Sequence, residues 1–253
     1  MSAAQTFPAS QASDPQPLDG RVVLVTGAHG GLGSAAAKAC AHAGATVILL
    51  GRKVARLNRI YDAIVAEGQR EPLLYPLDLE GASPDDYAQM AERIETELGR
   101  LDGVLHCAAD FAGLTPLLHT DPAAFARAIH INLTAPWWLS QACIPLLSKA
   151  DDAALVFAVD DLARVGKAFW GGYGIAQHGR AGLVGMLHAE LVTTSVRVAG
   201  LQPGPMRTAL RSRAYVEESA RLADDPDRYA PACVTLLSSA GAIHRGQVWE
   251  PAP

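Results

Sequence analysis

The chain has 253 residues, of which 49% are hydrophobic and 19% charged, and its formal net charge is −5. This length and apolar content suffice for one α/β domain with a full core. Because acidic and basic residues are interspersed, the sequence lacks the clustered positive surface that nucleic acid or an anionic membrane requires. We therefore expect a small-molecule substrate, and neither a nucleic-acid nor a membrane partner.

Residues 1–19 are expected to be a flexible leader, because they are rich in Ala, Ser, Gln and Pro and lack the basic and apolar regions of a signal peptide. No later segment approaches the 18 uninterrupted apolar residues of a transmembrane helix. Residues 20–253 are expected to form a single domain of a cytoplasmic protein. Four cysteines lie in apolar runs without CxxC spacing, as is typical of buried free thiols, and indicate neither disulfides nor zinc: Cys40, Cys107, Cys143 and Cys233.

Short apolar strands alternate with helices along this domain. The apolar runs predict strands at residues 21–27, 45–52, 71–79, 101–109, 153–159, 195–204 and near 246–250. Helical spacing and terminal glycines predict helices at residues 34–44, 53–68, 83–99, from 120 onward, and 169–191. The helix at 83–99 has a serine N-cap and a proline at its first position. Because the strands are apolar throughout, we predict one doubly wound parallel α/β sheet of about seven strands with helices on both faces.

The first strand ends in the glycine-rich turn TGAHGGLG. Without a Cβ atom, Gly27, Gly31 and Gly33 permit a sharp turn, a close approach of the backbone to a pyrophosphate, and tight packing of helix on strand. The helix that follows offers N–H groups and the positive end of its dipole to phosphates. This turn predicts a dinucleotide site that also includes His29 and Leu32. An ordinary strand-to-helix loop in a glycine-rich protein is the alternative.

The spacing Thr-Gly-x-x-x-Gly-x-Gly resembles the short-chain dehydrogenase/reductase (SDR) family, whose fold is the Rossmann fold. The resemblance extends from about residue 20 to the end of the chain. Asp78 and Leu79 are similar to the family's adenine-contacting pair, and HCAA at residues 106–109 occupies the place of Asn-Asn-Ala-Gly, with Ala108 against the cofactor. The segment PGPMRT resembles the one that closes on the nicotinamide, which implies cofactor contacts for Pro203, Gly204 and Thr208.

The residues after the second strand favour NADP(H) over NAD(H). An acidic residue there binds both ribose hydroxyls of NAD, whereas a 2′-phosphate needs cations. This chain has Gly51, Arg52 and Lys53 at that point. Arg52 can bind a phosphate with two hydrogen bonds, and Lys53 adds a point charge. The alternative is that both are only the solvated start of a helix, so NAD(H) stays possible.

The resemblance also implies an active site of asparagine, serine, tyrosine and lysine, in which the lysine fixes the nicotinamide ribose and lowers the tyrosine pKa. Asn132 and Tyr173 match the asparagine and the tyrosine. Thirteen positions before Tyr173, where the family has serine, lies Asp160, and four positions after it, where the family has lysine, lies Gln177. Two of the four catalytic positions are therefore altered.

These two substitutions have different consequences. Gln177 can bond a ribose hydroxyl but supplies no positive charge, so Tyr173 remains a proton donor for ketone reduction and a poor base for alcohol oxidation. An ionised Asp160 would oppose a developing alkoxide, whereas a protonated Asp160 could donate to the carbonyl oxygen. Alternatively, Asp160 points at Arg164 or at a cationic substrate, or it lies outside the site because the loop is shifted by one residue.

We therefore expect an NADP(H)-dependent oxidoreductase that reduces a carbonyl compound, or else a catalytically impaired SDR-fold protein that binds dinucleotide in a regulatory role. The polar segment at residues 209–231 resembles the family's substrate lid, with arginines near its base at positions 207, 211 and 213. No histidine pair has metal-site spacing, so no metal is expected. His106 alone merits a site role, although a half-buried, hydrogen-bonded histidine is the favoured interpretation.

Part of an apolar stripe on the helix at 169–191 is expected to face the sheet. The surplus, with apolar residues of the preceding long helix, predicts a subunit interface, and hence a homodimer or homotetramer. The residues concerned are Leu183, Val184, Leu187, Leu191, Trp137, Trp138 and Leu139.

Overall fold

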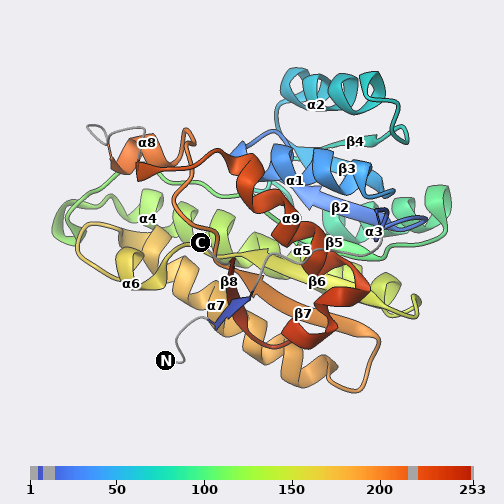
Figure 1. Ribbon diagram of the computed structural model, residues 1–253. Helices are drawn as coiled ribbons and strands as arrows, with labels where there is room; N and C mark the ends of the chain where they lie inside the picture. Colours follow the sequence, from blue (N-terminus) through green and yellow to red (C-terminus); the bar gives the residue numbers. More distant parts are fainter. Residues whose placement is uncertain (1–4, 8–14, 216–221, 252–253) are drawn as a thin grey trace.

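The computed structural model describes residues 5–7, 15–215 and 222–251, with a parallel sheet through their middle (Figure 1). Within these residues the sheet has eight strands in the order β1-β8-β7-β6-β5-β2-β3-β4, and all neighbours are parallel. The predicted doubly wound parallel sheet is confirmed. Its strands are β1 (Gln5–Phe7), β2 (Val22–Thr26), β3 (Thr46–Gly51), β4 (Leu73–Pro76), β5 (Gly103–His106), β6 (Ala153–Ala158), β7 (Val196–Leu201) and β8 (Val248–Pro251).

Strand β1 was not expected, because it lies within the segment interpreted as a flexible leader. It pairs in parallel with β8 and adds one strand to the edge of the sheet beyond the seven anticipated. Backbone pairing does not need an apolar run, so the polar composition of the leader gave no signal for it. Residues 1–4 and 8–14 of that segment lie outside the described residues.

Helices cover both faces of the sheet. Alternate residues of β2 face two cores: Val23 and Val25 pack with α1, α2 and α9, whereas Val22 and Leu24 pack with α3, α5 and α7. Ser83 caps α3 as predicted, its hydroxyl accepting from the backbone N–H of Asp86. These helices are α1 (Gly31–His42), α2 (Val54–Ala66), α3 (Pro84–Leu98), α5 (Ala135–Leu147), α7 (Gly171–Leu191) and α9 (Ala230–Leu237); the described residues also include α4 (Pro122–Ile129), α6 (Leu162–Val165) and α8 (Arg211–Ala214).

The helix predicted from residue 120 onward is interrupted. It consists of α4, a π-helical turn at His130–Thr134, and α5. π turns within α-helices are frequent at functional sites, because the extra residue redirects side chains and carbonyls. Asn132 lies in this turn.

The chain order of the strands creates a crevice beside β2. From β2 the chain proceeds outward to β3 and β4, then returns to β5 on the other side of β2. The connections after β2 and β5 therefore leave the sheet in opposite directions. In open α/β sheets, ligands bind outside the carboxyl ends of the strands at such a point.

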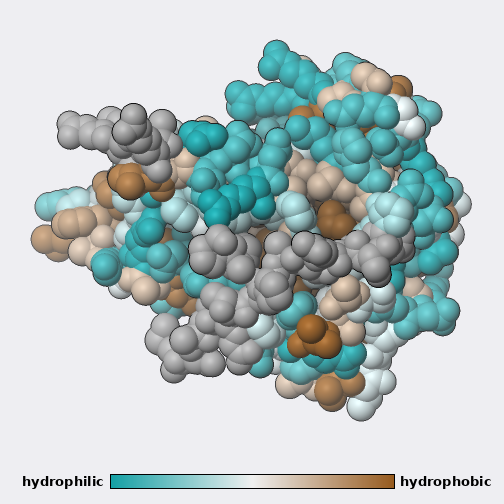
Figure 2. All heavy atoms as spheres, in the orientation of Figure 1, coloured by the Kyte–Doolittle hydropathy of each residue, from teal (hydrophilic) through white to brown (hydrophobic). Residues whose placement is uncertain are grey.

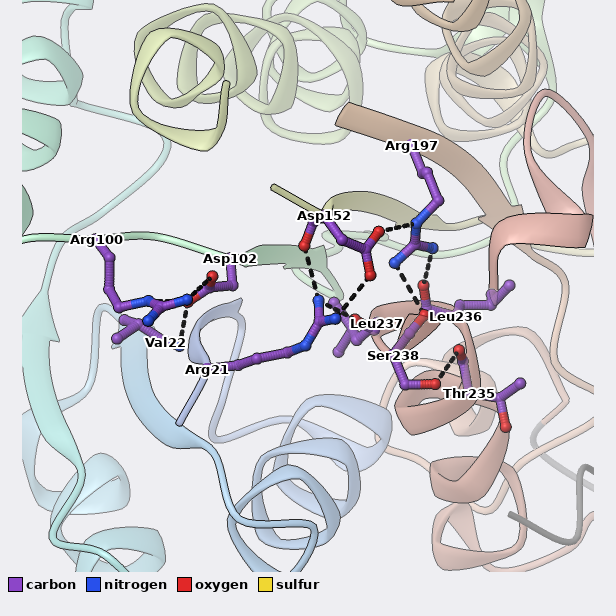
Figure 3. Close-up of polar contacts among 10 residues, drawn as sticks. All are labelled: Arg21, Val22, Arg100, Asp102, Asp152, Arg197, Thr235, Leu236, Leu237 and Ser238. Carbon is purple, nitrogen blue, oxygen red and sulfur yellow. Dashed lines mark hydrogen bonds and ion pairs between the residues drawn. The ribbon is translucent and has the colours of Figure 1, made fainter. Parts of the chain in front are cut away.

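An ion network ties the opposite, amino-terminal ends of the strands together (Figure 3). The Asp152 carboxylate, just before β6, accepts from Arg21 at 2.7 Å and from Arg197 at 2.6 Å. Burial by itself would raise the pKa of Asp152, but the hydrogen bonds from the two arginines lower it. Nearby, the buried Asp102 accepts from the backbone N–H of Val22 at 2.8 Å. These charges therefore stabilise the amino-terminal edge of the sheet.

The apolar stripe expected to form a subunit interface is mostly internal. Leu139, Val184 and Leu187 are buried in the core that α3, α5 and α7 share, and Leu183, Leu191 and Trp138 pack against it. Trp137 stays 42% exposed.

Figure 2 shows mostly hydrophilic residues over the part of the surface that holds α2. No helix in the described part of the chain is long and apolar enough to cross a membrane.

Candidate active site

A pocket of about 850 Å³ opens at the carboxyl ends of β2, β3, β5, β6 and β7. Asp160, Tyr173 and Gln177 line it, as do all the predicted cofactor-binding residues except Gly33; Asn132 does not line it. The chain therefore brings together residues that lie up to 181 positions apart, from Gly27 to Thr208. The predicted cofactor residues in the lining are Gly27, His29, Gly31, Leu32, Arg52, Lys53, Asp78, Leu79, Ala108, Tyr173, Pro203, Gly204 and Thr208.

The glycine-rich turn forms a cradle that side chains would fill. Gly27 has a φ of +65°, and a Cβ atom on it would lie 2.7 Å from the Cα atom of Ala108. A Cβ on Gly31 would lie 2.4 Å from the Thr208 methyl group, and one on Gly33 would lie 2.2 Å from the Gly27 carbonyl oxygen. Gly33 thus does not line the pocket but lets α1 pack closely under it. The concave backbone at the start of α1 fits a pyrophosphate.

Cations gather at one end of this pocket. Arg52, Lys53 and Arg56 line it beside His29. Burial lowers the pKa of His29, and the charges of Arg56, Lys53 and Arg52 lower it further. Arg56 was not among the predicted cofactor residues, although its place in the first turn of the helix that follows Arg52 and Lys53 was a usable signal. Three cations around a half-buried histidine fit a phosphate group.

Tyr173 and Asp160 are in direct contact. The Tyr173 hydroxyl donates to Asp160 Oδ2 at 2.8 Å, and the Asp160 backbone N–H donates to Gln177 Oε1 at 3.1 Å. The loop is therefore in the register that the thirteen-residue interval implies, and the alternative of a shifted loop is wrong. The alternative partner is also wrong, because Arg164 pairs with Asp161 at 3.5 Å.

The environment of Tyr173 opposes its ionisation. Its side chain is only 4% exposed. Burial raises the pKa of Tyr173 well above 10, the Asp160 charge and hydrogen bond raise it further, and Arg180 alone acts in the lowering direction. Tyr173 is therefore protonated at neutral pH, as a proton donor must be.

Arg180 is a further residue of the site that the sequence analysis missed. It lines the pocket, is 1% exposed and lies on α7 seven residues after Tyr173. Its guanidinium donates to three backbone carbonyls, those of Ala158 at 2.8 Å, Asn132 at 3.0 Å and Ala108 at 3.2 Å. A charged residue on the same helix face as Tyr173 and Gln177 was the signal that could have found it.

Asn132 positions a loop and does not face the pocket. Its side-chain oxygen accepts from the Asp110 backbone N–H at 3.0 Å, and its amide nitrogen donates to the carbonyls of Asp110 at 2.7 Å and Ala128 at 2.8 Å. Asn132 is fully buried. It therefore fixes the chain after β5, where residues 107–111 line the pocket.

Aromatic side chains form the outer wall of the pocket. The ring of Phe111 lies 5.0 Å from that of Trp170 and 5.1 Å from that of Tyr173, and Tyr215 closes the group 6.3 Å from Trp170. The Arg211 guanidinium stacks 4.4 Å from the Tyr215 ring. Flat apolar faces beside the Tyr173 hydroxyl can stack on a planar ligand.

The predicted lid contributes only some of its arginines to the pocket. Arg211 and Arg213 line it, and Arg213 Nη1 donates to the Phe111 carbonyl at 2.5 Å. Arg207 turns away and donates to the Ala223 carbonyl at 2.8 Å and to Asp225 at 3.3 Å. Residues 216–221 of the lid lie outside the described residues.

His106 belongs to the core and not to the pocket. It is 1% exposed, its Nε2 lies 3.0 Å from the Ser140 hydroxyl, and its ring stacks 4.6 Å from that of Phe157. Burial and the charge of Arg180 hold its pKa well below 6.5. The interpretation as a hydrogen-bonded histidine without a site role is confirmed, although the ring is fully buried instead of half-buried.

Comparison with known proteins agrees with the resemblance. Residues 21–219 match the family model of short chain dehydrogenases. The chain is 34% identical over 236 residues to the uncharacterized oxidoreductase YciK of Escherichia coli K12, covering 93% of each chain. A solved short chain dehydrogenase structure from Pseudomonas syringae is 37% identical with a TM-score of 0.89, covering 99% of each chain. Another, from Escherichia coli CFT073 in complex with NADPH, is 34% identical with a TM-score of 0.89, covering 93% of this chain and 98% of that one.

Proposed function

Because the chain belongs to the short chain dehydrogenase family and is an oxidoreductase of that type, we propose that it reduces a carbonyl compound with NADPH. The observation that carries this proposal is the Tyr173 hydroxyl, which lies in the same pocket as the glycine cradle and the cations around His29. A proton donor and a dinucleotide cradle in one pocket are the two parts that carbonyl reduction needs.

The residues present fit NADP(H). The cradle of Gly27 and Gly31 would hold the pyrophosphate at the start of α1. Glycine is needed at both positions, because side chains there would collide with neighbouring backbone and with Thr208. Arg52, Lys53 and Arg56 would hold a 2′-phosphate. A relative of 34% identity was solved in complex with NADPH, which supports the same choice here. When bound, the cofactor supplies a hydride to the carbonyl carbon.

The chain's own residues supply the proton and the positioning. Tyr173 donates its hydroxyl proton to the carbonyl oxygen, which requires the O–H to turn from Asp160 to the substrate. The side-chain oxygen of Gln177 accepts a hydrogen bond from the Asp160 backbone N–H, so its amide NH₂ is the group available for a ribose hydroxyl. Phe111 and Trp170 exclude water and stack on a flat substrate.

The test is NADPH consumption with a panel of ketones, aldehydes and diketones. Tyr173→Phe is expected to lower turnover about 100-fold or more while NADPH still binds, because general acid catalysis contributes about 10²–10⁴-fold. Tyr61→Phe, a partly buried tyrosine on α2 outside the pocket lining, is the matched control and should keep full activity. Equal turnover in Tyr173→Phe and the native chain would refute the role of Tyr173.

One observation favours a second function, a dinucleotide-binding protein without turnover. The Tyr173 proton is engaged by Asp160, and both burial and that carboxylate raise the tyrosine pKa. Tight NADPH binding by fluorescence titration, with no consumption on any carbonyl of the panel, would favour this function over reduction.

We also propose that the protein is a homodimer or homotetramer of the cytoplasm. Its exposed apolar side chains include Trp137 at 42% and Met186 at 64% exposure, on helices α5 and α7, which pack into the same core. Light scattering of the purified protein tests the assembly, and a monomer would contradict it.

A further inference from the structure

A buried cation lies on the same helix face as Tyr173, although the position of the expected lysine holds Gln177. Tyr173, Gln177 and Arg180 follow one another at intervals of four and three residues on α7, so their side chains lie along one side of the helix. All three line the pocket and all three are buried.

No carboxylate of the described residues neutralises the charge of Arg180. Within the described residues no carboxylate forms an ion pair with it; its hydrogen-bond acceptors there are the carbonyls of Ala108, Asn132 and Ala158. Burying an arginine without a carboxylate is costly. Three carbonyls hold the planar guanidinium in one orientation, which a lysine, with its compact ammonium group, could not reproduce.

We propose that Arg180 replaces the missing lysine as the cation that stabilises the ionised form of Tyr173, and that it acts as a positioning residue for the proton transfer. Its positive charge counteracts the negative charge of Asp160, the carboxylate that accepts a hydrogen bond from the tyrosine. Electrostatics agree with the geometry: burial lowers the pKa of Arg180 to about 10, so it is still protonated at neutral pH, and Arg180 in turn lowers the pKa of Tyr173. The active-site cation has thus not been lost but lies three residues further along α7.

This inference rests on the proposed function, so its test must not depend on turnover. A fluorinated tyrosine at position 173 has a lower intrinsic pKa, which brings its titration into the stable pH range, and fluorine NMR follows its ionisation with NADP⁺ bound. Removing the charge in R180M is expected to raise the titration midpoint by about one pH unit or more, a tenfold smaller ionised fraction at a given pH. R180Q, whose amide can still donate to a carbonyl, serves if R180M does not fold.

Two further variants separate charge from architecture. R180K keeps the charge but loses part of the carbonyl contacts, and is expected to stay within about half a pH unit of the native midpoint. Adding Q177K to R180M or R180Q restores a cation one turn from Tyr173 and should return the midpoint toward the native value. R197M, which removes a buried arginine at the other end of the sheet, is the matched control and should lower stability without moving the midpoint.

The proposal would be overturned if R180M and R180Q left the titration midpoint unchanged, or if R180K raised it as much as R180Q does. Arg180 would then be a purely structural residue. In the kinetic version, with diacetyl as the probe, the pH profile of reduction should shift in R180Q and return in R180Q/Q177K. Absence of turnover on every carbonyl would remove the proposed function, whereas the NMR titration would still decide the role of Arg180.

Discussion

The Tyr173 hydroxyl donates a 2.8 Å hydrogen bond to the Asp160 carboxylate, an acid that stands where the family has serine. Replacing Asp160 by serine removes a negative charge that raises the Tyr173 pKa and opposes a developing alkoxide. We expect Asp160→Ser to increase diacetyl reduction about 100-fold or more, since one preorganised donor is typically worth about 3 kcal/mol. Initial rates of NADPH consumption measure this.

Asp161→Ser is the control for that variant, because Asp161 pairs with Arg164 and does not bond Tyr173. It should leave the rate within about twofold, as expected for the loss of a partly exposed ion pair. If the native chain is instead fast on some substrate and Asp160→Ser slows it, the aspartate is a recruited catalytic or substrate-binding group.

Arg52 should set the preference for the phosphorylated cofactor. Arg52→Ala removes one charged contact to the 2′-phosphate, worth roughly 1.5–3 kcal/mol, and is expected to weaken NADPH binding about 10- to 100-fold with little effect on NADH. Fluorescence titration with both cofactors measures the difference between the NADPH and NADH affinities. Arg59→Ala, on the helix that follows Arg52 but outside the pocket lining, should change neither affinity. Equal native affinities for NADPH and NADH would sink the prediction.

Gly33 should tolerate no side chain, because a Cβ atom would lie 2.2 Å from the Gly27 carbonyl oxygen. Gly33→Ala is expected to lower the free energy of unfolding by about 1–3 kcal/mol and to abolish NADPH binding by displacing the cradle. Gly182→Ala is the matched control, since a Cβ there meets nothing within 4 Å, and alanine should stabilise α7 by about 0.5–1 kcal/mol. Denaturant unfolding distinguishes the two, and normal NADPH binding by Gly33→Ala would contradict the model of the cradle.

Asp152 should contribute stability that depends on pH. Its folded-state pKa lies below the ordinary 3.8, because Arg197 and Arg21 outweigh the effect of burial. A carboxylate whose pKa is lowered on folding stabilises the fold fully at pH values above its unfolded-state pKa. This contribution is lost as the pH falls through its folded-state pKa. We expect the native chain to lose this part of its stability below about pH 3.8.

Asp152→Asn should remove the same contribution at neutral pH, about 1–3 kcal/mol given that the carboxylate is 32% exposed. Thermal or denaturant unfolding measures it. Asp19→Asn, which breaks an exposed pair with Arg70, is the control and should change stability far less. Identical losses in the two variants would show that the network in Figure 3 has no special weight.

The order of elements and the cofactor end of the pocket were predictable from local sequence. Alternating apolar strands and helices require a covered parallel sheet, and the glycines of TGAHGGLG are needed because a side chain on them would collide with neighbouring backbone or with Thr208. Arg52 and Lys53 follow β3 directly, and the carboxyl ends of parallel strands share one edge of a sheet, so their place beside the cradle follows from the chain order. β1 escaped prediction because an edge pairing needs no apolar signal.

The sequence by itself determined that Tyr173, Gln177 and Arg180 lie on one helix face, because that depends only on a period of 3.6 residues. Only the tertiary structure decided that Asp160 accepts a hydrogen bond from Tyr173 and that Asp161, not Asp160, pairs with Arg164. The partner of a carboxylate in a loop depends on how that loop packs. The same holds for Arg180, whose acceptors come from the ends of β5 and β6 and from the π turn. Whether a charge is buried, and whether an acid neutralises it, depends on residues distant in the chain, and spacing along a single helix carries no information about them.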